Sequence, residues 1–199
     1  MPDSRGNSGD VVMIILASGS PRRKSLLESL GVSFTVYSPD VDENMLPGET
    51  PSDLCARLSV MKAEAGLREY PSGTIIAADT MVVIGDEVLG KPANRTEAAR
   101  MLRELSGKVH EVITGLTVIH DGNTLTSTVH TFVKFRELSD DEISAYIKTG
   151  EPDDKAGGYA VQGKGSLLIE RINGDYYNVV GLPLFRLGEM LASVGISFL

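Results

Sequence analysis

The chain has 199 residues, of which 42% are hydrophobic and 23% are charged, and its formal net charge is −8. This length suits one sizeable domain or two small lobes that share a cleft. The acidic balance, without any run of basic residues, argues against a nucleic-acid-binding surface.

The start of the chain carries no sign of export or of a membrane anchor. Its apolar run, 11–17, is too short for a membrane span or for a signal-peptide core. Residues 1–10 are small and polar, and we expect a disordered tail ahead of a single domain over 11–199. These features predict a cytoplasmic protein that does not bind membranes.

The first predicted elements are a strand, a turn and a helix. The β-favouring run 11–17 predicts a strand that is buried on both faces. Small residues at 18–20 then turn the chain, and Pro21 suits the first position of a helix that ends near Leu30. A second strand is expected over 32–37.

A polar loop over 38–49 precedes a second helix, which Thr50-Pro51 should begin. Apolar residues recur on one face of this helix at the helical period, which predicts that this face packs on a core. They are Leu54, Leu58, Met61 and Ala65.

The middle of the chain is rich in β signals. A strand is expected over 74–84, and Gly85-Asp86 predicts a tight hairpin turn into 88–89. Asn94 and Glu97 have the spacing of a capping box for the following helix. The alternating runs 109–120 and 124–136 predict an antiparallel pair.

Three further features complete the chain. Ser139 and Glu142 form a second predicted capping box, and the glycine-rich stretch 151–165 is expected to be a functional loop. Asn173-Gly174 predicts a hairpin between strands at 166–172 and 176–180. Pro183 should begin a last helix. The mixture predicts an α/β fold, a mixed sheet with helices on its faces.

The turn after the first strand is the strongest candidate for chemistry. Free backbone N–H groups at a helix start, together with the helix dipole, favour an anion. Arg22 and Arg23 add guanidinium groups that suit phosphate oxygens. The alternative is a solvated pair of arginines at an exposed helix end.

Other polar residues allow more than one interpretation. Asp79 ends an apolar run, so it is either a turn or capping residue or a buried functional carboxylate. Lys91 by itself is a surface lysine. The acidic group Asp40, Asp42 and Glu43 is either a solvated loop or a site for a hard cation.

Three features argue against other functions. The spacing from Gly85 to Lys91 fits a P-loop, but Pro92 stands where a Mg²⁺-binding hydroxyl is needed, so we reject that motif. The histidines at 110, 120 and 130 lack close metal-ligand spacing and are expected to be structural. Cys55 is the only cysteine and is expected to be a buried thiol.

Taken together, the chain resembles the Maf family of nucleotide pyrophosphatases from about Ile14 to the C-terminus. Eight segments in order carry the resemblance: LASGSPRR (16–23), DVDE (40–43), RLSVMKA (57–63), AADT (77–80), GKP (90–92), LSGKVHEVITG (105–115), EPDDKAGGYAVQGKG (151–165) and INGDYYNVVGLPL (172–184).

The resemblance implies cleavage of a nucleoside triphosphate to its monophosphate and pyrophosphate with a divalent metal, Mg²⁺ or Mn²⁺. It also implies an elongated mixed sheet in two lobes around a cleft, similar to inosine triphosphate pyrophosphatases, and a homodimer. The implied proton acceptor is Asp79, although it could instead bind the metal, for which Glu43 is the implied ligand. The implied substrate-binding residues are Ser18, Arg22, Arg23, Lys62, Thr80, Lys91 and Gln162, and Lys155 could also reach the cleft.

The sequence around Gln162 is similar to the branch of the family that acts on dTTP and UTP. Arg22 and Thr80 also lie at positions where the family sets its base preference. Two alternatives remain: a pyrophosphatase that prefers 7-methyl-GTP, and a nucleotide-binding regulator of cell division without turnover.

Overall fold

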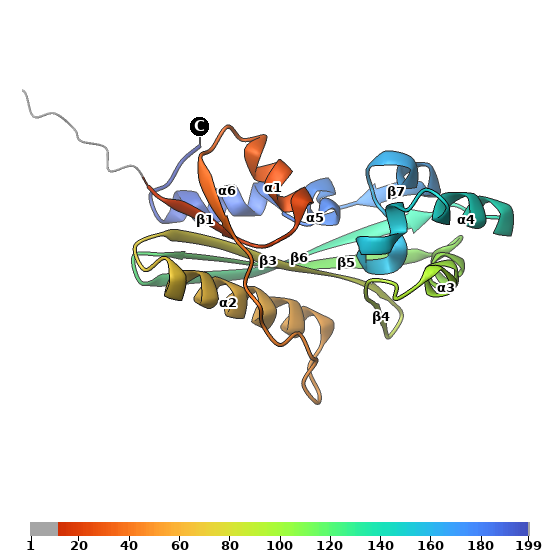
Figure 1. The fold of residues 1–199 in the computed structure, drawn as a ribbon, viewed down its shortest axis with the longest axis horizontal. Helices are drawn as coiled ribbons and strands as arrows, with labels where there is room; N and C mark the ends of the chain where they lie inside the picture. Colours follow the sequence, from red (N-terminus) through yellow and green to blue (C-terminus); the bar gives the residue numbers. More distant parts are fainter. Residues whose placement is uncertain (1–11, 199) are drawn as a thin grey trace, which may run out of the picture.

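The structure, a computed structural model, describes residues 12–198 and has an elongated mixed α/β fold (Figure 1). The predicted tail at 1–10 lies outside the described residues. The strands are β1 (Ile14–Ala17), β2 (Phe34–Tyr37), β3 (Thr74–Ile84), β4 (Glu87–Leu89), β5 (Val109–His120), β6 (Asn123–Phe135) and β7 (Ile169–Asn173). The α-helices are α1 (Pro21–Glu28), α2 (Pro51–Glu69), α3 (Arg95–Leu105), α4 (Asp140–Ile147), α5 (Tyr176–Val180) and α6 (Leu184–Ser193).

The seven strands form one sheet in the order β2-β1-β3-β5-β6-β7, with β4 paired to β3. β1 is parallel to β2 and β3, whereas the remaining neighbours are antiparallel. The mixed sheet with flanking helices that the sequence predicts is therefore confirmed. None of the helices within 12–198 is both long and apolar enough to cross a bilayer.

The edge of β3 that faces away from β5 is shared by two short strands. β1 pairs with it as far as Ile76, and β4 pairs with it from Val82 onward. Over the interval 77–81, no strand among the described residues pairs with this edge. Within this interval Ala77 and Ala78 are fully buried and Asp79 is 8% exposed, whereas Thr80 and Met81 are half-buried.

Alternation along the strands buries both faces of the first half of the sheet. Ile15 and Ala17 of β1 pack toward α2, in the cluster that also holds Ala63. Ile14 and Leu16 pack on the opposite face, with α1, α5 and α6. Such period-two burial on both faces explains why the predicted run is continuously apolar.

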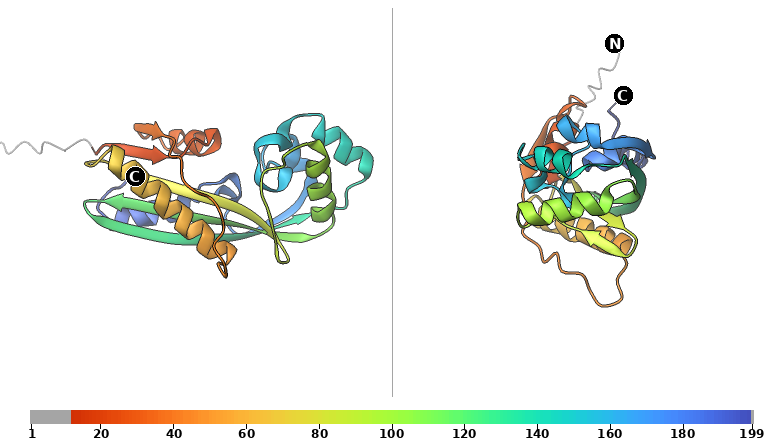
Figure 2. Two further views of the ribbon diagram at one scale, coloured as in Figure 1. Left: turned by 60° about the horizontal axis from the view of Figure 1, so that its bottom comes forward. Right: turned by 90° about the vertical axis from the view of Figure 1, so that its right-hand side faces the viewer.

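The other half of the molecule has its own hydrophobic cluster, built on α3 and α4. Met101, Leu105 and Ile147 pack there against the distal parts of β5 and β6, with Phe135 at the centre. Figure 2 shows the two halves joined by the long strands β3, β5 and β6. The predicted two-lobed arrangement thus follows from two cores on one sheet.

The close packing of α2 on the sheet depends on a glycine. A Cβ atom at Gly115 of β5 would lie 2.1 Å from the backbone oxygen of Cys55. The Cys55 thiol is buried, as predicted, and burial raises its pKa to about 12. The helix that carries it therefore lies directly on the strand.

Several local predictions are confirmed. Ser139 and Glu142 make both bonds of a capping box, and Gly85-Asp86 joins β3 to β4 as a tight turn. Asn94 caps α3, but the carboxylate of Glu97 accepts from the N–H of Ala93 rather than completing the box. Leu54, Leu58 and Ala65 of α2 are buried, whereas Met61 is half-buried.

The hairpin predicted around Asn173-Gly174 is wrong. Residues 163–168 form a 3₁₀ turn, and residues 176–180 form helix α5 instead of a strand. Asp175 caps α5 by accepting from the N–H of Tyr177, at 2.7 Å. Strand β7 pairs with β6 rather than with residues 176–180. A helix cap therefore prevails over the Asn-Gly turn signal.

The three histidines lie apart, His120 beside Thr74 and His130 beside Glu111. His110 is buried between Phe135 and Tyr159, with its Nε2 2.7 Å from the Tyr159 hydroxyl. Its Nδ1 has no hydrogen-bond partner, and burial lowers the pKa of His110 to about 4. The ring is therefore held neutral in the folded protein.

We predict that His110 makes the protein sensitive to mild acid. The unfolded ring, with a pKa of about 6.5, binds more protons than the folded one, so its contribution to stability is complete above about pH 6.5 and is lost as the pH falls toward 4. From pH 7 to pH 4.5 the loss should be roughly 2 to 3 kcal/mol. Urea denaturation of the wild type and of His110→Leu at both pH values measures it. Equal losses in both proteins would refute this role.

Candidate functional site

The nine residues that the resemblance singles out come together in one place. All of them line a cavity of about 980 Å³ between the two halves of the molecule. They are Ser18, Arg22, Arg23, Glu43, Lys62, Asp79, Thr80, Lys91 and Gln162. The cavity lies where the edge of β3 is open, with the turn after β1 on one side and Gly90-Lys91, which follow β4, on the other.

The turn after β1 has little space around it. A Cβ atom at Gly19 would lie 2.6 Å from the hydroxyl of Ser38, so a larger residue at this position would displace the Ser38 side chain. Ser20 and Pro21 then begin α1, and the Ser20 side chain makes no capping bond. Pro21 has no N–H, so the first backbone donors of α1 belong to Arg22 and Arg23, which both line the cavity.

Arg23 is the centre of the hydrogen bonds at this end of the cavity. Its Nε donates to the carbonyl of Gly181 at 2.7 Å, and its two terminal nitrogens donate to Ser18 Oγ and Thr80 Oγ1, each at 3.0 Å. Burial lowers the pKa of the Arg23 guanidinium, and the charge of Asp79 opposes that shift. Arg23 thereby links α1, β3 and the segment after α5.

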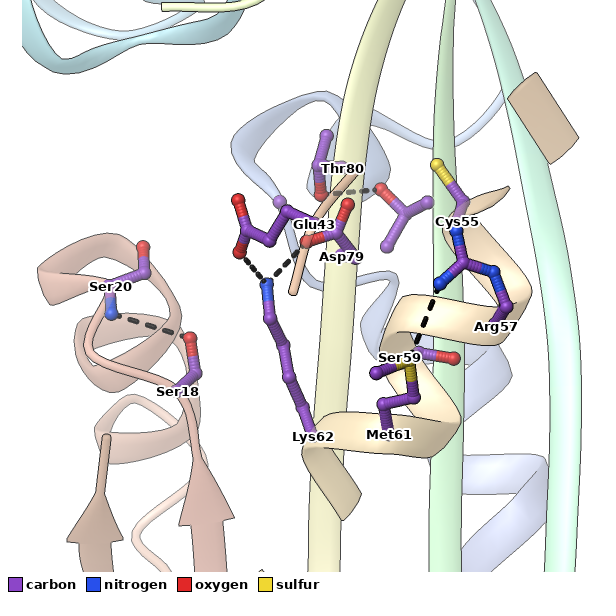
Figure 3. A network of polar contacts seen from close by, with 12 residues as sticks. Ser18, Ser20, Glu43, Cys55, Arg57, Ser59, Met61, Lys62, Asp79 and Thr80 are labelled. Carbon is purple, nitrogen blue, oxygen red and sulfur yellow. Dashed lines mark hydrogen bonds and ion pairs between the residues drawn. The ribbon is translucent and has the colours of Figure 1, made fainter. Parts of the chain in front are cut away.

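The opposite face of β3 holds an ion-pair cluster. The ammonium of Lys62, on α2, lies 2.6 Å from Asp79 Oδ1 and 2.7 Å from Glu43 Oε1. Figure 3 shows the Lys62 side chain reaching between these two carboxylates. Asp79 is 8% exposed, whereas Glu43 comes from the exposed loop before α2. The turn or capping role considered for Asp79 is therefore replaced by an ion pair inside the cavity.

A clamp holds the loop that carries Glu43. The Arg57 guanidinium binds both oxygens of Glu49, at 2.7 and 2.8 Å, and also the carbonyl of Asn44 at 2.9 Å. The Arg57 hydrogen bonds lower the pKa of Glu49 to about 2. Glu43 lies between the loop's start and this anchor, so the clamp limits how far its carboxylate can move.

The far side of the cavity belongs to the stretch 151–165, which forms three short 3₁₀ turns. Glu151 accepts from the backbone N–H groups of Lys164 and Gly165, at 3.0 and 3.1 Å. Desolvation raises the pKa of Glu151, but these amides and Lys155 hold it below its usual value. The end of this stretch, next to Gln162, is thus held against its first residue, Glu151.

One ion pair crosses the mouth of the cavity. Arg22 Nη1 of α1 lies 3.2 Å from Asp154 Oδ2, and Lys155 also pairs with Asp154. Desolvation raises the pKa of Asp154, but Lys155 and Arg22 together hold it low. The Arg22 guanidinium is therefore paired with a carboxylate of the chain itself, which differs from the solvated pair of arginines considered as an alternative.

Sequence reasoning did not single out Arg57, Glu49, Glu151 or Asp154. Arg57, Glu151 and Asp154 fall inside segments of the family resemblance, but nothing in their local sequence indicates a partner. The spacing of eight residues between Glu49 and Arg57 spans a loop and a helix turn, so no helical or strand periodicity relates the two.

The donor set fits a divalent metal that is bound together with a substrate. Within 12–198 no group of three His, Cys, Asp or Glu side chains is arranged to hold a metal alone. Glu43 and Asp79, however, both lie within 2.7 Å of the same ammonium, so their carboxylates converge. Mg²⁺ is commonly held by one or two carboxylates plus substrate phosphates, and Glu43 and Asp79 would supply the carboxylates.

Comparison with known proteins gives consistent matches along nearly the whole chain. The sequence profile of the family described as Maf-like protein matches residues 13–194. A dTTP/UTP pyrophosphatase of Symbiobacterium thermophilum is 48% identical over 92% of this chain and 94% of its own length. A dTTP/UTP pyrophosphatase of Methanosarcina barkeri is 49% identical over 92% and 95%.

Among solved structures, the Ham1 protein of Staphylococcus aureus aligns with a TM-score of 0.47 and 16% identity, over 79% of each chain.

We predict that loss of the Arg57–Glu49 ion pair lowers catalytic activity more than it lowers the stability of the fold. Glu49→Gln keeps the shape but removes the charge that Arg57 binds, so the loop with Glu43 should become mobile. Pyrophosphate release from a nucleoside triphosphate should fall about tenfold in kcat/KM. Glu142→Gln is the control, because Glu142 is likewise bound by an arginine and has a pKa of about 2 but lies at the start of α4, away from the loop that carries Glu43. Equal losses in both variants would contradict the prediction.

A second prediction concerns the ion pair across the mouth. Asp154→Asn should release Arg22 for an anionic ligand, so the KM for a nucleoside triphosphate should fall about threefold. The stability should change by less than about 1 kcal/mol, since exposed ion pairs contribute little. Steady-state kinetics and thermal melts measure both. A raised KM would show instead that Asp154 positions Arg22.

Proposed function

The chain belongs to the Maf family, and on that premise we propose that it hydrolyses dTTP and UTP to the nucleoside monophosphate and pyrophosphate. The observation that carries this proposal is the convergence of five cationic side chains, among them that of Lys155, and the carboxylate of Asp79 in one cavity of an otherwise acidic protein. Two relatives that are almost half identical have this activity in their names.

Catalysis of phosphoryl transfer depends mainly on neutralising the charge of the phosphates and on positioning the reacting groups. Arg22, Lys62 and Lys91 reach the cavity from α1, α2 and the loop after β4. They would surround a triphosphate from three sides. Two of these cations are paired with the protein's own carboxylates, so a triphosphate would exchange one set of negative partners for another.

Ser18 is prepared to donate to a phosphate oxygen. Its Oγ accepts from Arg23 at 3.0 Å and from the N–H of Ser20 at 3.3 Å. A hydroxyl accepts two hydrogen bonds and donates one. Because both acceptor positions are used inside the protein, the proton of Ser18 is the group left for a substrate.

Asp79 is the group that we assign to the proton of the attacking water. It lies in the open interval of β3, is nearly buried, and has the Lys62 ammonium at 2.6 Å. A positioned carboxylate that accepts the proton as water attacks the α-phosphorus would release pyrophosphate as the leaving group. Glu43, the other carboxylate at Lys62, is the metal ligand in this assignment.

Mg²⁺ or Mn²⁺ bound at Glu43 and the phosphates would neutralise charge on the phosphate oxygens. The chain's own residues then orient the triphosphate and keep the carboxylate of Asp79 within the cavity. Base preference is assigned to Arg22, Thr80 and Gln162, which lie at three different walls of the same cavity.

The direct test is pyrophosphate release from a panel of nucleoside triphosphates with Mg²⁺ or Mn²⁺. We expect dTTP and UTP to be the best substrates. A preference for 7-methyl-GTP would refute the base assignment but keep the reaction. Binding of nucleotides without any release would refute the enzymatic function and favour a regulator.

Asp79→Asn tests the assigned proton acceptor. The amide keeps the shape of the side chain but cannot accept the proton, so kcat should fall by about 10² to 10⁴. Asp86→Asn is the control, because Asp86 lies in the exposed turn after the same strand. Near-normal turnover in folded Asp79→Asn would exclude this role.

A further inference from the structure

Two threonines face each other directly behind the cavity. Thr80 of β3 and Thr114 of β5 are paired in register, and their hydroxyl oxygens are 2.9 Å apart. Thr80 lines the cavity, whereas Thr114 does not line it and is fully buried. Thr114 thus touches a residue of the site without being part of its surface.

The neighbours of this pair determine which way the protons point. The Arg23 guanidinium can only donate, and it donates to Thr80 Oγ1 at 3.0 Å. At the other end, Thr114 Oγ1 lies 3.4 Å from the carbonyl of Asn178, which can only accept. The chain therefore runs in one direction: Arg23 donates to Thr80, Thr80 donates to Thr114, and Thr114 donates to Asn178.

The acceptor at Asn178 supports this direction over the reverse. Thr114 has no exposed surface, so its proton has a partner within the protein in either direction, Asn178 in one and Thr80 in the other. The Asn178 carbonyl belongs to the last turn of a five-residue helix, where carbonyls lack partners within the helix. The reverse direction would leave that carbonyl without the Thr114 proton.

Asn178 itself is held firmly. Its side-chain amide donates to the carbonyl of Val112 and to Thr131 Oγ1, each at 3.0 Å. Asn178 is fully buried, so α5 is fixed against β5 and β6 at this point. The end of the hydrogen-bond chain is therefore a fixed acceptor.

We propose that Thr114 is a positioning residue that turns the hydroxyl of Thr80 into a hydrogen-bond acceptor toward the cavity. Thr80 receives one bond from Arg23 and gives its proton to Thr114, which leaves one lone pair unused. A phosphate oxygen, itself an acceptor, is repelled there. The lone pair fits an N–H donor, and on the proposed substrates the base supplies one in the imide N–H of uracil or thymine.

This inference rests on the proposed function and makes it more specific. Cytosine carries an acceptor nitrogen where uracil carries the imide N–H, so Thr80 should discriminate between the two bases. A site that hydrogen-bonds its ligand rejects an analogue with the wrong group, because buried polar atoms then lack partners. Removing the hydroxyl of Thr114 frees the Thr80 proton to turn toward the cavity, where it can serve cytosine.

The experiment compares Thr114→Val with Thr114→Ser and Thr117→Val. Thr114→Ser keeps the hydroxyl and should restore the wild-type preference. Thr117 is the matched control, because it is also fully buried on β5 and bonds to the hydroxyls of Ser59 and Thr126, away from the cavity. Calorimetry measures the affinities for the α,β-methylene analogues of UTP and CTP, and pyrophosphate release from UTP and CTP is measured in parallel.

We expect the wild type, Thr114→Ser and Thr117→Val to prefer the UTP analogue, and Thr114→Val to lose about tenfold of that preference. The inference is overturned if the wild type does not discriminate, if Thr114→Val keeps the ratio, or if Thr117→Val changes it equally. An equal loss of affinity for both analogues in Thr114→Val would place the sugar, not the base, at Thr80, and would also overturn it. If the wild type releases no pyrophosphate but the binding ratios are as expected, the proposed hydrolysis is refuted and the inference stands.

Discussion

The site depends on a gap in strand pairing. β3 is long, but the edge away from β5 is covered by β1 only to Ile76 and by β4 only from Val82. Between them β5 is the only strand among the described residues that pairs with β3, so the other edge stays open. Asp79 and Thr80 occupy this interval, and because successive side chains alternate they reach opposite faces of the strand. One adjacent pair of residues thereby meets Lys62 on one face and Arg23 on the other.

Three of the cations that line the cavity are bound by groups of the protein itself. Lys62 lies between Glu43 and Asp79, Arg22 pairs with Asp154, and Arg23 uses each of its three nitrogens within the protein. Such internal pairs allow an acidic chain to keep several positive groups partly buried without leaving any charge bare. They also distinguish two kinds of cation: Arg22 and Lys62 can exchange carboxylates for phosphates, whereas Arg23 chiefly holds Ser18 and Thr80 in position.

Supporting contacts fix the orientation of the residues that line the cavity. The Arg57–Glu49 pair restrains the loop with Glu43. Glu151 holds together the two ends of the loop beside Gln162. Thr114, with the carbonyl of Asn178, sets the direction in which the Thr80 hydroxyl donates its proton. Of these residues, Glu151 lines the cavity, whereas Glu49, Arg57, Thr114 and Asn178 lie behind its surface. Preorganised polar groups of this kind are effective because they do not have to reorient when charge develops.

The sequence by itself determined the features that depend on nearby residues. Alternating apolar strands, the cap at Ser139, the turn at Gly85-Asp86 and the ordered family segments are all readable within a few positions. Its one clear error, a strand at 176–180, arose where a cap at Asp175 and contacts with Thr131 outweighed a local turn signal. Only the tertiary structure decided that Lys62 meets Asp79 and that Arg23 meets Thr80. Those pairs join residues 17 and 57 positions apart, and their meeting depends on how α1 and α2 pack on the two faces of the sheet, which no local pattern records.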